Sequence, residues 1–332
     1  MTAFRLRTRE AAEAIERETL AQGATLSSSS RGRVVPEEPD PWRTPFERDH
    51  DRILHSKAFR RLKHKTQVFM NPEGDHYVTR MTHTLQVTQI GSAIARALSL
   101  NVALAEAVCL GHDVGHSPFG HTGEDALSEF VDGEWRHSDQ SVRIFEVLEP
   151  SNLTFEVLEG IKTHPWKVEQ RATTHEGDIV RFADRIAYLA HDALDALRAD
   201  IIDPSAFPGD VLRAFGEPGR EWIRTMVQSV IDESFRQNTI AMESSLLEAM
   251  HTLRDYMFTN VYLRPSAETQ RRRAQQIVRD LVTYYLERVD EVPESYRHAE
   301  SDDLTQVIDY VAGMTDRYAI RTHDELFRPR LG

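Results

Sequence analysis

Apolar residues recur with the period of an α-helix along most of this chain, and this pattern limits the fold more than any other feature. Between Ile223 and Phe235, apolar side chains stand at positions i, i+3, i+4, i+7, i+8 and i+12. Residues 277–285 and 304–311 follow the same rule. Strand-like alternation is nearly absent, and breakers that contain Pro or Gly separate the periodic stretches. The sequence therefore predicts an all-α protein of roughly a dozen helices joined by short loops.

The charge balance and the cysteine count exclude several protein classes. Among the 332 residues, 40 Lys and Arg stand against 53 Asp and Glu, which gives a net charge of −13. This acidic balance disfavours general nucleic-acid affinity, although the basic residues between Lys57 and Lys65 are a local exception. Cys109 is the single cysteine, so an internal disulfide is excluded. Because no apolar run approaches the ~18 residues of a membrane span, we expect a cytoplasmic protein without membrane contact.

The first 45 residues differ in character from the rest of the chain. Residues 11–20 fit one short helix, whereas residues 27–30 and 36–41 have the composition of turns and linkers. We therefore predict that residues 1–45 form an N-terminal arm. Two interpretations of this arm stay open: a flexible tail, or a segment that packs on a neighbouring subunit.

Most of the 15 histidines gather between residues 50 and 191. His112 and Asp113 follow an apolar helical stretch, and a buried His–Asp pair needs a compensating cation or polar network. Imidazole nitrogen together with carboxylate oxygen suits ions such as Mn, Fe, Co, Ni, Mg or Zn. The plainer interpretation is a polar pair at the surface. His83 and Asp184 favour the cation, because each lies in another apolar helical stretch and can supply a further ligand.

His83, His112, Asp113 and Asp184 match an H…HD…D pattern, and on these residues the chain resembles the HD-domain phosphohydrolases. Further segments are similar to bacterial dNTP triphosphohydrolases, from about residue 31 to residue 329. These segments are FRRLKHKTQV (59–68), GDHY (74–77), TRMTHT (79–84), the stretch 111–124, DRIAY (184–188) and DYVAGMTDRYA (309–319). The resemblance implies a multi-helix HD-domain fold, with a catalytic core at 46–205 and a C-terminal helical part at 206–332 that packs on the core.

The resemblance also implies a reaction, in which a dNTP and water give a deoxynucleoside and inorganic triphosphate. The base preference stays open, with dGTP as one candidate. His83, His112, Asp113 and Asp184 would be the metal ligands, and Mn²⁺, Mg²⁺ or Co²⁺ the divalent cation. The alternatives are an HD phosphohydrolase for another nucleotide, a single-stranded nucleic-acid-binding protein of this fold, and a scaffold without turnover.

A second group of residues is implied to carry out proton transfer. His121 and Glu124 are three residues apart, so they share one helical face. In the family this pair does acid–base work, and His116 is brought into the pocket by a turn. The structural alternative is a histidine at a helix start, with a first-turn carboxylate that the helix dipole favours.

Residues on one helix face are implied to contact the nucleotide. Asp184, Tyr188 and Asp192 stand at i, i+4 and i+8, so one face presents all three. By resemblance, Tyr188 packs near the deoxyribose and Asp192 accepts from the 3′-hydroxyl. The alternative is an amphipathic helix with a half-buried tyrosine. The residues implied to bind substrate are Gln67, Arg80, His137, Arg185, Tyr188 and Asp192.

Other residues near these motifs carry weaker signals. Val68 would follow Gln67 at the sugar, and His76 would line the pocket entrance. His164 and His175 are each equally well explained as structural histidines. Asp316 belongs to the segment that closes over the nucleotide in the family, or forms an ion pair with Arg317.

The resemblance also bears on partners. A dNTP is the expected substrate, and a second dNTP as allosteric activator stays open. A homo-oligomer is expected, with a hexamer the common form in the family. Single-stranded nucleic acid remains a weaker candidate partner, supported by the basic residues 57–65.

Overall fold

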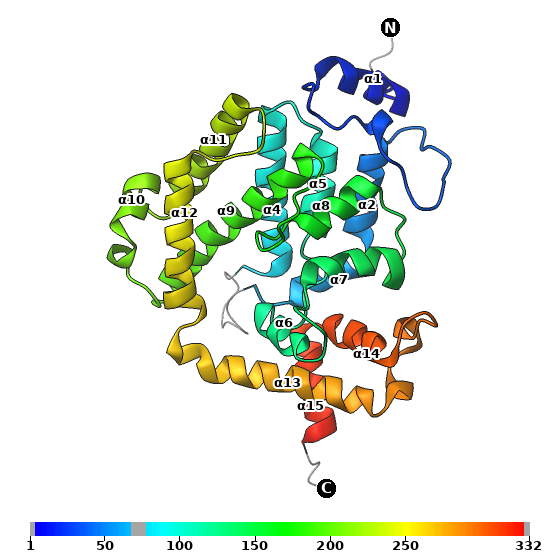
Figure 1. Cartoon of the computed structure of the whole chain (residues 1–332), viewed down its shortest axis with the longest axis vertical. Helices are drawn as coiled ribbons and strands as arrows, with labels where there is room; N and C mark the ends of the chain where they lie inside the picture. Colours follow the sequence, from blue (N-terminus) through cyan, green and yellow to red (C-terminus); the bar gives the residue numbers. More distant parts are fainter. Residues whose placement is uncertain (1–3, 68–77, 329–332) are drawn as a thin grey trace.

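The structure, a computed structural model, describes residues 4–67 and 78–328 (Figure 1). In this part of the chain the regular structure is helical, without a β-strand and with two isolated β-bridges. The predicted all-α, multi-helix fold is confirmed. No described helix has both the length and the apolar character that a membrane span requires. The described α-helices are α1 (Arg9–Thr19), α2 (Pro45–His55), α3 (Lys57–Arg61), α4 (Arg80–Ala97), α5 (Val102–Gly111), α6 (His121–Ser128), α7 (His137–Arg143), α8 (Phe155–Thr163), α9 (His175–Arg198), α10 (Gly209–Phe215), α11 (Arg220–Gln237), α12 (Ser244–Met257), α13 (Glu268–Leu286), α14 (Asp303–Ala312) and α15 (Asp316–Phe327).

Helix α5 lies at the centre of the main core because its sequence is apolar except for Glu106. Leu104, Ala107 and Val108 are completely buried, and α2, α4, α8 and α9 surround the helix. A helix without a polar face is stable only when neighbours cover it completely. The Asn101 side chain caps its start by accepting a hydrogen bond from the Leu104 N–H at 3.2 Å.

Small residues allow the central helices to approach closely. A Cβ at Gly91 of α4 would lie 2.6 Å from the Cys109 Sγ of α5, and a Cβ at Gly160 of α8 would lie 2.8 Å from Val108. Helix α9 packs against both α4 and α5. The start of α4, the end of α5 and the middle of α9 therefore meet, and their polar residues can form one site.

A second hydrophobic cluster joins the C-terminal helices to α6. It includes Leu127 of α6, Val278 and Leu281 of α13, and Val311 of α14, all completely buried. Figure 1 shows α13 lying across the end of the molecule next to α6, α14 and α15. The main hydrophobic cluster runs from Phe46 to Val261 and includes residues on both sides of the predicted 205/206 boundary. That boundary stays a prediction.

The N-terminal arm packs on the core of its own chain. The buried Glu176 carboxylate of α9 accepts hydrogen bonds from the N–H of Thr25 at 3.0 Å, its hydroxyl at 2.9 Å and the Asn101 N–H at 2.9 Å. The buried Glu156 of α8 accepts from the Arg31 N–H at 2.6 Å. Hydrogen bonds to ionised groups are stronger than neutral ones. The flexible-tail interpretation therefore does not describe the segment around residues 25–31.

Replacing Glu176 tests how strongly the arm is anchored. We expect Glu176→Ala to lower the free energy of unfolding by about 2–4 kcal/mol, because donors on the half-buried Thr25 and the buried Asn101 lose their acceptor. Urea denaturation followed by circular dichroism measures this change. The exposed Glu10→Ala is the control, for which we expect an unfolding midpoint close to that of the wild type. Equal effects of the two substitutions would show that the arm is not anchored through Glu176.

Candidate active site

The turn after α5 presents His112 with one nitrogen directed into the interior of the protein. The His112 Nδ1 lies 2.6 Å from the Cys109 carbonyl oxygen, which can only accept, so Nδ1 carries the proton. Nε2 therefore carries the lone pair. This nitrogen is buried and has no hydrogen-bond partner among the described residues. A buried lone pair without a donor is the arrangement that a metal ligand requires.

The other three predicted metal ligands lie around this nitrogen. His112 Nε2 is 3.5 Å from Asp113 Oδ1 and 3.8 Å from Asp184 Oδ1. His83 Nε2 is 3.0 Å from Asp184 Oδ1 and 4.0 Å from Asp113 Oδ2. The structure thus brings together residues from α4, the turn after α5, and α9. The ligand atoms of His83, His112 and Asp184 lie within 4.8 Å of one another, and so do those of His112, Asp113 and His164, so the two groups share His112.

The charges at this cluster are those of a cation site. Burial alone would raise the pKa of Asp113, but His116 and Arg80 hold it well below its usual range. Burial also acts to raise the pKa of Asp184, but His83 and His112 hold it below its usual range. Burial lowers the pKa of His112, which keeps this ring neutral. Two ionised carboxylates and a neutral imidazole suit a divalent cation.

Arg80 and His116 hold the Asp113 carboxylate from two sides. Arg80 Nη1 donates to Asp113 Oδ2 at 2.7 Å, and His116 Nε2 lies 2.9 Å from Asp113 Oδ1. Gly120 makes room for the arginine, because a Cβ there would lie 2.7 Å from Arg80 Nη2. Gly120 also has a φ of +58°, a conformation that side-chain-bearing residues rarely adopt.

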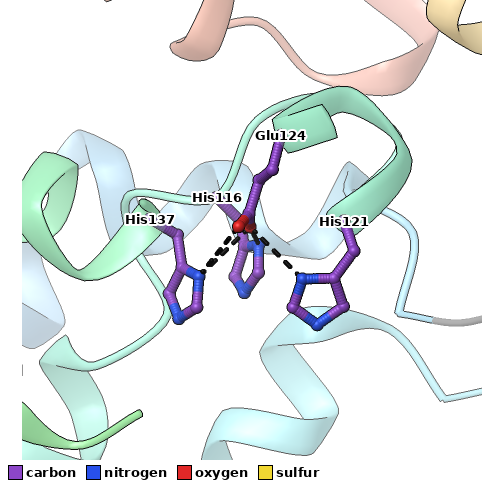
Figure 2. Close-up of side chains that lie close together, drawn as sticks. All are labelled: His116, His121, Glu124 and His137. Atoms are coloured by element: carbon purple, nitrogen blue, oxygen red, sulfur yellow. Dashed lines mark hydrogen bonds and ion pairs between the residues drawn. The ribbon is translucent and has the colours of Figure 1, made fainter. Parts of the chain in front are cut away.

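A second group of side chains lies directly beside the first, and we call it the Glu124 cluster: His116, His121, Glu124 and His137 (Figure 2). Glu124 Oε1 contacts His116 Nδ1, lies 3.1 Å from His137 Nδ1 and lies 3.6 Å from His121 Nδ1. His121 is 73% exposed in its side chain, whereas His116 is buried. The predicted catalytic residues are therefore in mutual contact, and His121 opens the group to solvent.

His164 is a site residue that the sequence did not distinguish from a structural histidine. Its Nε2 lies 3.2 Å from His137 Nε2, and its ring centroid lies 5.0 Å from that of His112. It therefore connects the two clusters from the end of α8. The sequence signal is only a histidine after an apolar helix. His175, by contrast, lies at the start of α9 beside Gly23 of the arm.

The predicted phosphate and sugar residues line α9 next to the metal-ligand cluster. The Arg185 guanidinium carbon lies 3.8 Å from the centroid of the Trp166 ring, an attractive cation–π arrangement. The Tyr262 hydroxyl donates to Asp192 Oδ2 at 2.9 Å. Burial raises the pKa of Asp192 to about 7. Trp166 and Tyr262 carry no sequence motif, so only the three-dimensional structure associates them with the site.

Gln67, Val68 and His76 lie at or beyond the edge of what the structure describes. Gln67 is described, and its buried Oε1 has no hydrogen-bond partner among the described residues. Val68 and His76 lie outside the described residues. Their predicted places at the sugar and the entrance stay predictions.

The C-terminal helices hold the loops of the site. Lys65 is buried, and its Nζ donates to the carbonyl oxygens of His116 and Ala312, the latter at 3.1 Å. Burial lowers the pKa of Lys65 to about 7. Asp316 accepts from the Thr66 N–H at 2.9 Å and the Phe119 N–H at 3.0 Å. Lys65 is thus neither a solvated residue nor a free phosphate ligand, and Asp316 binds backbone N–H groups of the core.

Comparisons with known proteins agree with this geometry. Residues 80–189 match the model of the HD domain, and residues 240–325 match that of the phosphohydrolase-associated domain. A deoxyguanosinetriphosphate triphosphohydrolase-like protein of Caldanaerobacter subterraneus subsp. tengcongensis is 44% identical over 98% of this chain and 97% of its own length. The chain belongs to this HD-domain family. A protein of the same description from Desulfatibacillum aliphaticivorans is 42% identical over 97% of this chain and 98% of its own.

Family membership establishes an HD-domain phosphohydrolase, and hence a hydrolase. The HD match includes His83, His112, Asp113 and Asp184. A solved phosphohydrolase structure from Bacteroides thetaiotaomicron is similar with a TM-score of 0.53 and 19% identity, over 84% of this chain and 68% of that chain. At this identity the similarity supports the fold alone.

The turn that carries His116 depends on a glycine. A Cβ at Gly115 would lie 2.3 Å from both the His137 carbonyl oxygen and the Ser141 nitrogen. We expect Gly115→Ala to lower the free energy of unfolding by about 1–3 kcal/mol, because backbone must move to relieve the overlap. Urea denaturation measures the change.

Gly209→Ala is the matched control for this substitution. Its Cβ would contact only Arg213 Nη1, the flexible end of a side chain, at 3.2 Å. We expect it to leave stability unchanged or slightly higher, because alanine reduces the freedom of the unfolded chain. Similar losses for both variants would contradict the proposed role of Gly115.

Proposed function

We propose that this protein is a metal-dependent dNTP triphosphohydrolase, which converts a dNTP and water to a deoxynucleoside and inorganic triphosphate. The observation that carries the proposal is the group of His83, His112 and Asp184, with Asp113 beside His112 and held by Arg80. The names of the relatives point to the same reaction class. The net charge of −13 disfavours single-stranded nucleic acid as the partner.

The first cluster fits the divalent ion that the family implies. His112 Nε2 is buried without a partner among the described residues. The Asp113 carboxylate faces Arg80 and His116 and that of Asp184 faces His83, and each carboxylate has further lone pairs to offer. Mn²⁺, Mg²⁺ and Co²⁺ all accept such nitrogen and oxygen ligands. When bound, a divalent ion would supply polarisation of the α-phosphate and a lowered pKa of the attacking water.

The side chains of the Glu124 cluster supply proton transfer in this proposal. Burial alone would raise the pKa of Glu124, but His137, His116 and His121 hold it well below its usual range. The ionised carboxylate can therefore stabilise a protonated His121 at 3.6 Å. His121 is exposed on the side open to solvent, where it can donate to the leaving 5′-oxygen. His116 and His137 keep Glu124 in place.

Positive charge and two hydroxyl-binding groups complete the nucleotide site. Arg185 is buried against Trp166, and its Nε has no partner among the described residues, so it can donate to a phosphate oxygen. Arg80 donates to Asp113 at 2.7 Å and adds a second positive charge. Asp192 and Tyr188 follow Asp184 on α9, and in this proposal they contact the sugar. The Asp192 carboxyl group can bind a 3′-hydroxyl while the Tyr262 hydroxyl holds it.

The test is a product assay with metal-stripped protein. Each dNTP is offered alone and in mixtures, with Mn²⁺, Mg²⁺, Co²⁺ or no metal, and products are resolved by ion-exchange chromatography. We expect deoxynucleoside and triphosphate in equal amounts, only when metal is present. We expect His112→Ala to lower kcat/KM by more than about 100-fold, since even outer-shell losses at metal sites cost 10–100-fold.

His323→Ala is the matched control, because it removes a histidine that pairs with Asp280 between α13 and α15. We expect it to keep wild-type activity. Release of diphosphate or orthophosphate would point to another phosphohydrolase reaction, and no turnover of any dNTP would contradict the proposal. Turnover only in dNTP mixtures would reveal an activator.

A further inference from the structure

The Glu124 cluster is built like a second metal site. Three imidazole Nδ1 atoms and one carboxylate oxygen converge from α6, α7 and the turn before α6, as Figure 2 shows. Tetrahedral zinc or cobalt sites have bonds of about 2.0–2.1 Å, so their ligand atoms lie roughly 3.3 Å apart. The distances of 3.1 Å from Glu124 Oε1 to His137 Nδ1 and 3.6 Å to His121 Nδ1 lie on either side of this value, whereas His116 Nδ1 lies closer to the same oxygen.

In the buried rings of His116 and His137, the Nε2 atoms already have polar partners. Metal-binding histidines show the same arrangement, in which the nitrogen that is not a ligand forms a hydrogen bond. His116 Nε2 faces the ionised Asp113 carboxylate at 2.9 Å, so this nitrogen carries the proton. His137 Nε2 faces His164 Nε2 at 3.2 Å, and His164 Nδ1 donates to the Ile161 carbonyl at 2.7 Å. His137 Nε2 is therefore the donor of that pair. In both rings Nδ1 is left as the ligand atom, the arrangement that outer-shell partners impose at metal sites.

Two of the proposed ligand atoms also lack satisfied hydrogen bonds. His116 is 2% exposed, and its Nδ1 has no hydrogen-bond partner of acceptable geometry among the described residues. The same holds for Glu124 Oε1, although the two atoms touch. Buried polar atoms in this condition are rare and commonly indicate a missing ion or water.

We propose that the Nδ1 atoms of His116, His121 and His137 and the carboxylate of Glu124 bind a second ion, a transition metal such as Zn²⁺ or Co²⁺. Three imidazoles and one carboxylate select these ions over Mg²⁺, which prefers oxygen ligands. His121, the exposed member, gives the ion a path from solvent. The Asp113–His116 contact connects the second site to the first.

One consequence rests on the proposed function. An ion in the second site occupies the carboxylate and the nitrogens that proton transfer requires. Excess Zn²⁺ should therefore lower dNTP turnover at saturating Mn²⁺, and a chelator should restore it.

The test measures bound metal directly, so that it does not depend on activity. Metal-stripped full-length protein is equilibrated with Zn²⁺ or Co²⁺, and bound metal is measured by mass spectrometry and by the visible absorption of tetrahedral Co²⁺. The variants are Glu124→Gln, which keeps the side-chain volume, and His121→Ala, which changes an exposed residue. His112→Ala removes a ligand of the first site, and His323→Ala is the control.

We expect wild type and His323→Ala to bind one ion more per chain than Glu124→Gln. We expect His121→Ala to lower the affinity for this second ion about tenfold or more. We expect His112→Ala to retain the second ion and its Co²⁺ absorption. Wild-type stoichiometry equal to that of Glu124→Gln, or loss of all metal in His112→Ala, would overturn the second site. Neither result would contradict the proposed hydrolase activity. If no dNTP is hydrolysed, the metal measurement still tests the second site.

Discussion

The Asp113 carboxylate is ionised although it is 3% exposed, and the rest of the site is arranged around this constraint. A buried charge is tolerated only with opposite charge and hydrogen bonds around it. Arg80 and His116 provide both, and His83 and His112 approach it within 4.0 Å. These residues come from separate helices, so the packing of α4, α5 and α9 and the chemistry of the site depend on each other.

The C-terminal helices extend this dependence to the far end of the chain. Asp309 of α14 is buried and accepts from Gln140 at 2.9 Å and from Arg143 at 2.6 Å. Asp316 of α15 accepts hydrogen bonds from the backbone N–H groups of Thr66 and Phe119. Lys65 donates a hydrogen bond to the Ala312 carbonyl oxygen. The associated domain therefore stabilises the loops that carry His116 and Gln67.

The parts of this molecule that the sequence predicted are those with a local signature. Apolar periodicity indicated the helices, and the His112–Asp113 pair with His83 and Asp184 indicated the first cluster. His164, Trp166 and Tyr262 escaped prediction because a lone histidine or aromatic residue looks the same in a core as in a site. The arm is anchored by a contact between Thr25 and Glu176, which are 151 residues apart in the sequence. A periodic pattern of apolar residues carries no information about such a distant contact. The homo-oligomer, the activator and the cytoplasmic location stay predictions.

A crystal structure of the protein grown with Mn²⁺, with anomalous diffraction measured, tests the central claim most directly. The account predicts an anomalous peak bonded to the Nε2 atoms of His83 and His112 and to carboxylate oxygens of Asp113 and Asp184. That position follows from the buried lone pair of His112 and the two ionised carboxylates beside it. A fully occupied Mn²⁺ at another position would contradict it, if the side chains of His83, His112, Asp113 and Asp184 were hydrogen-bonded to one another and not to the ion.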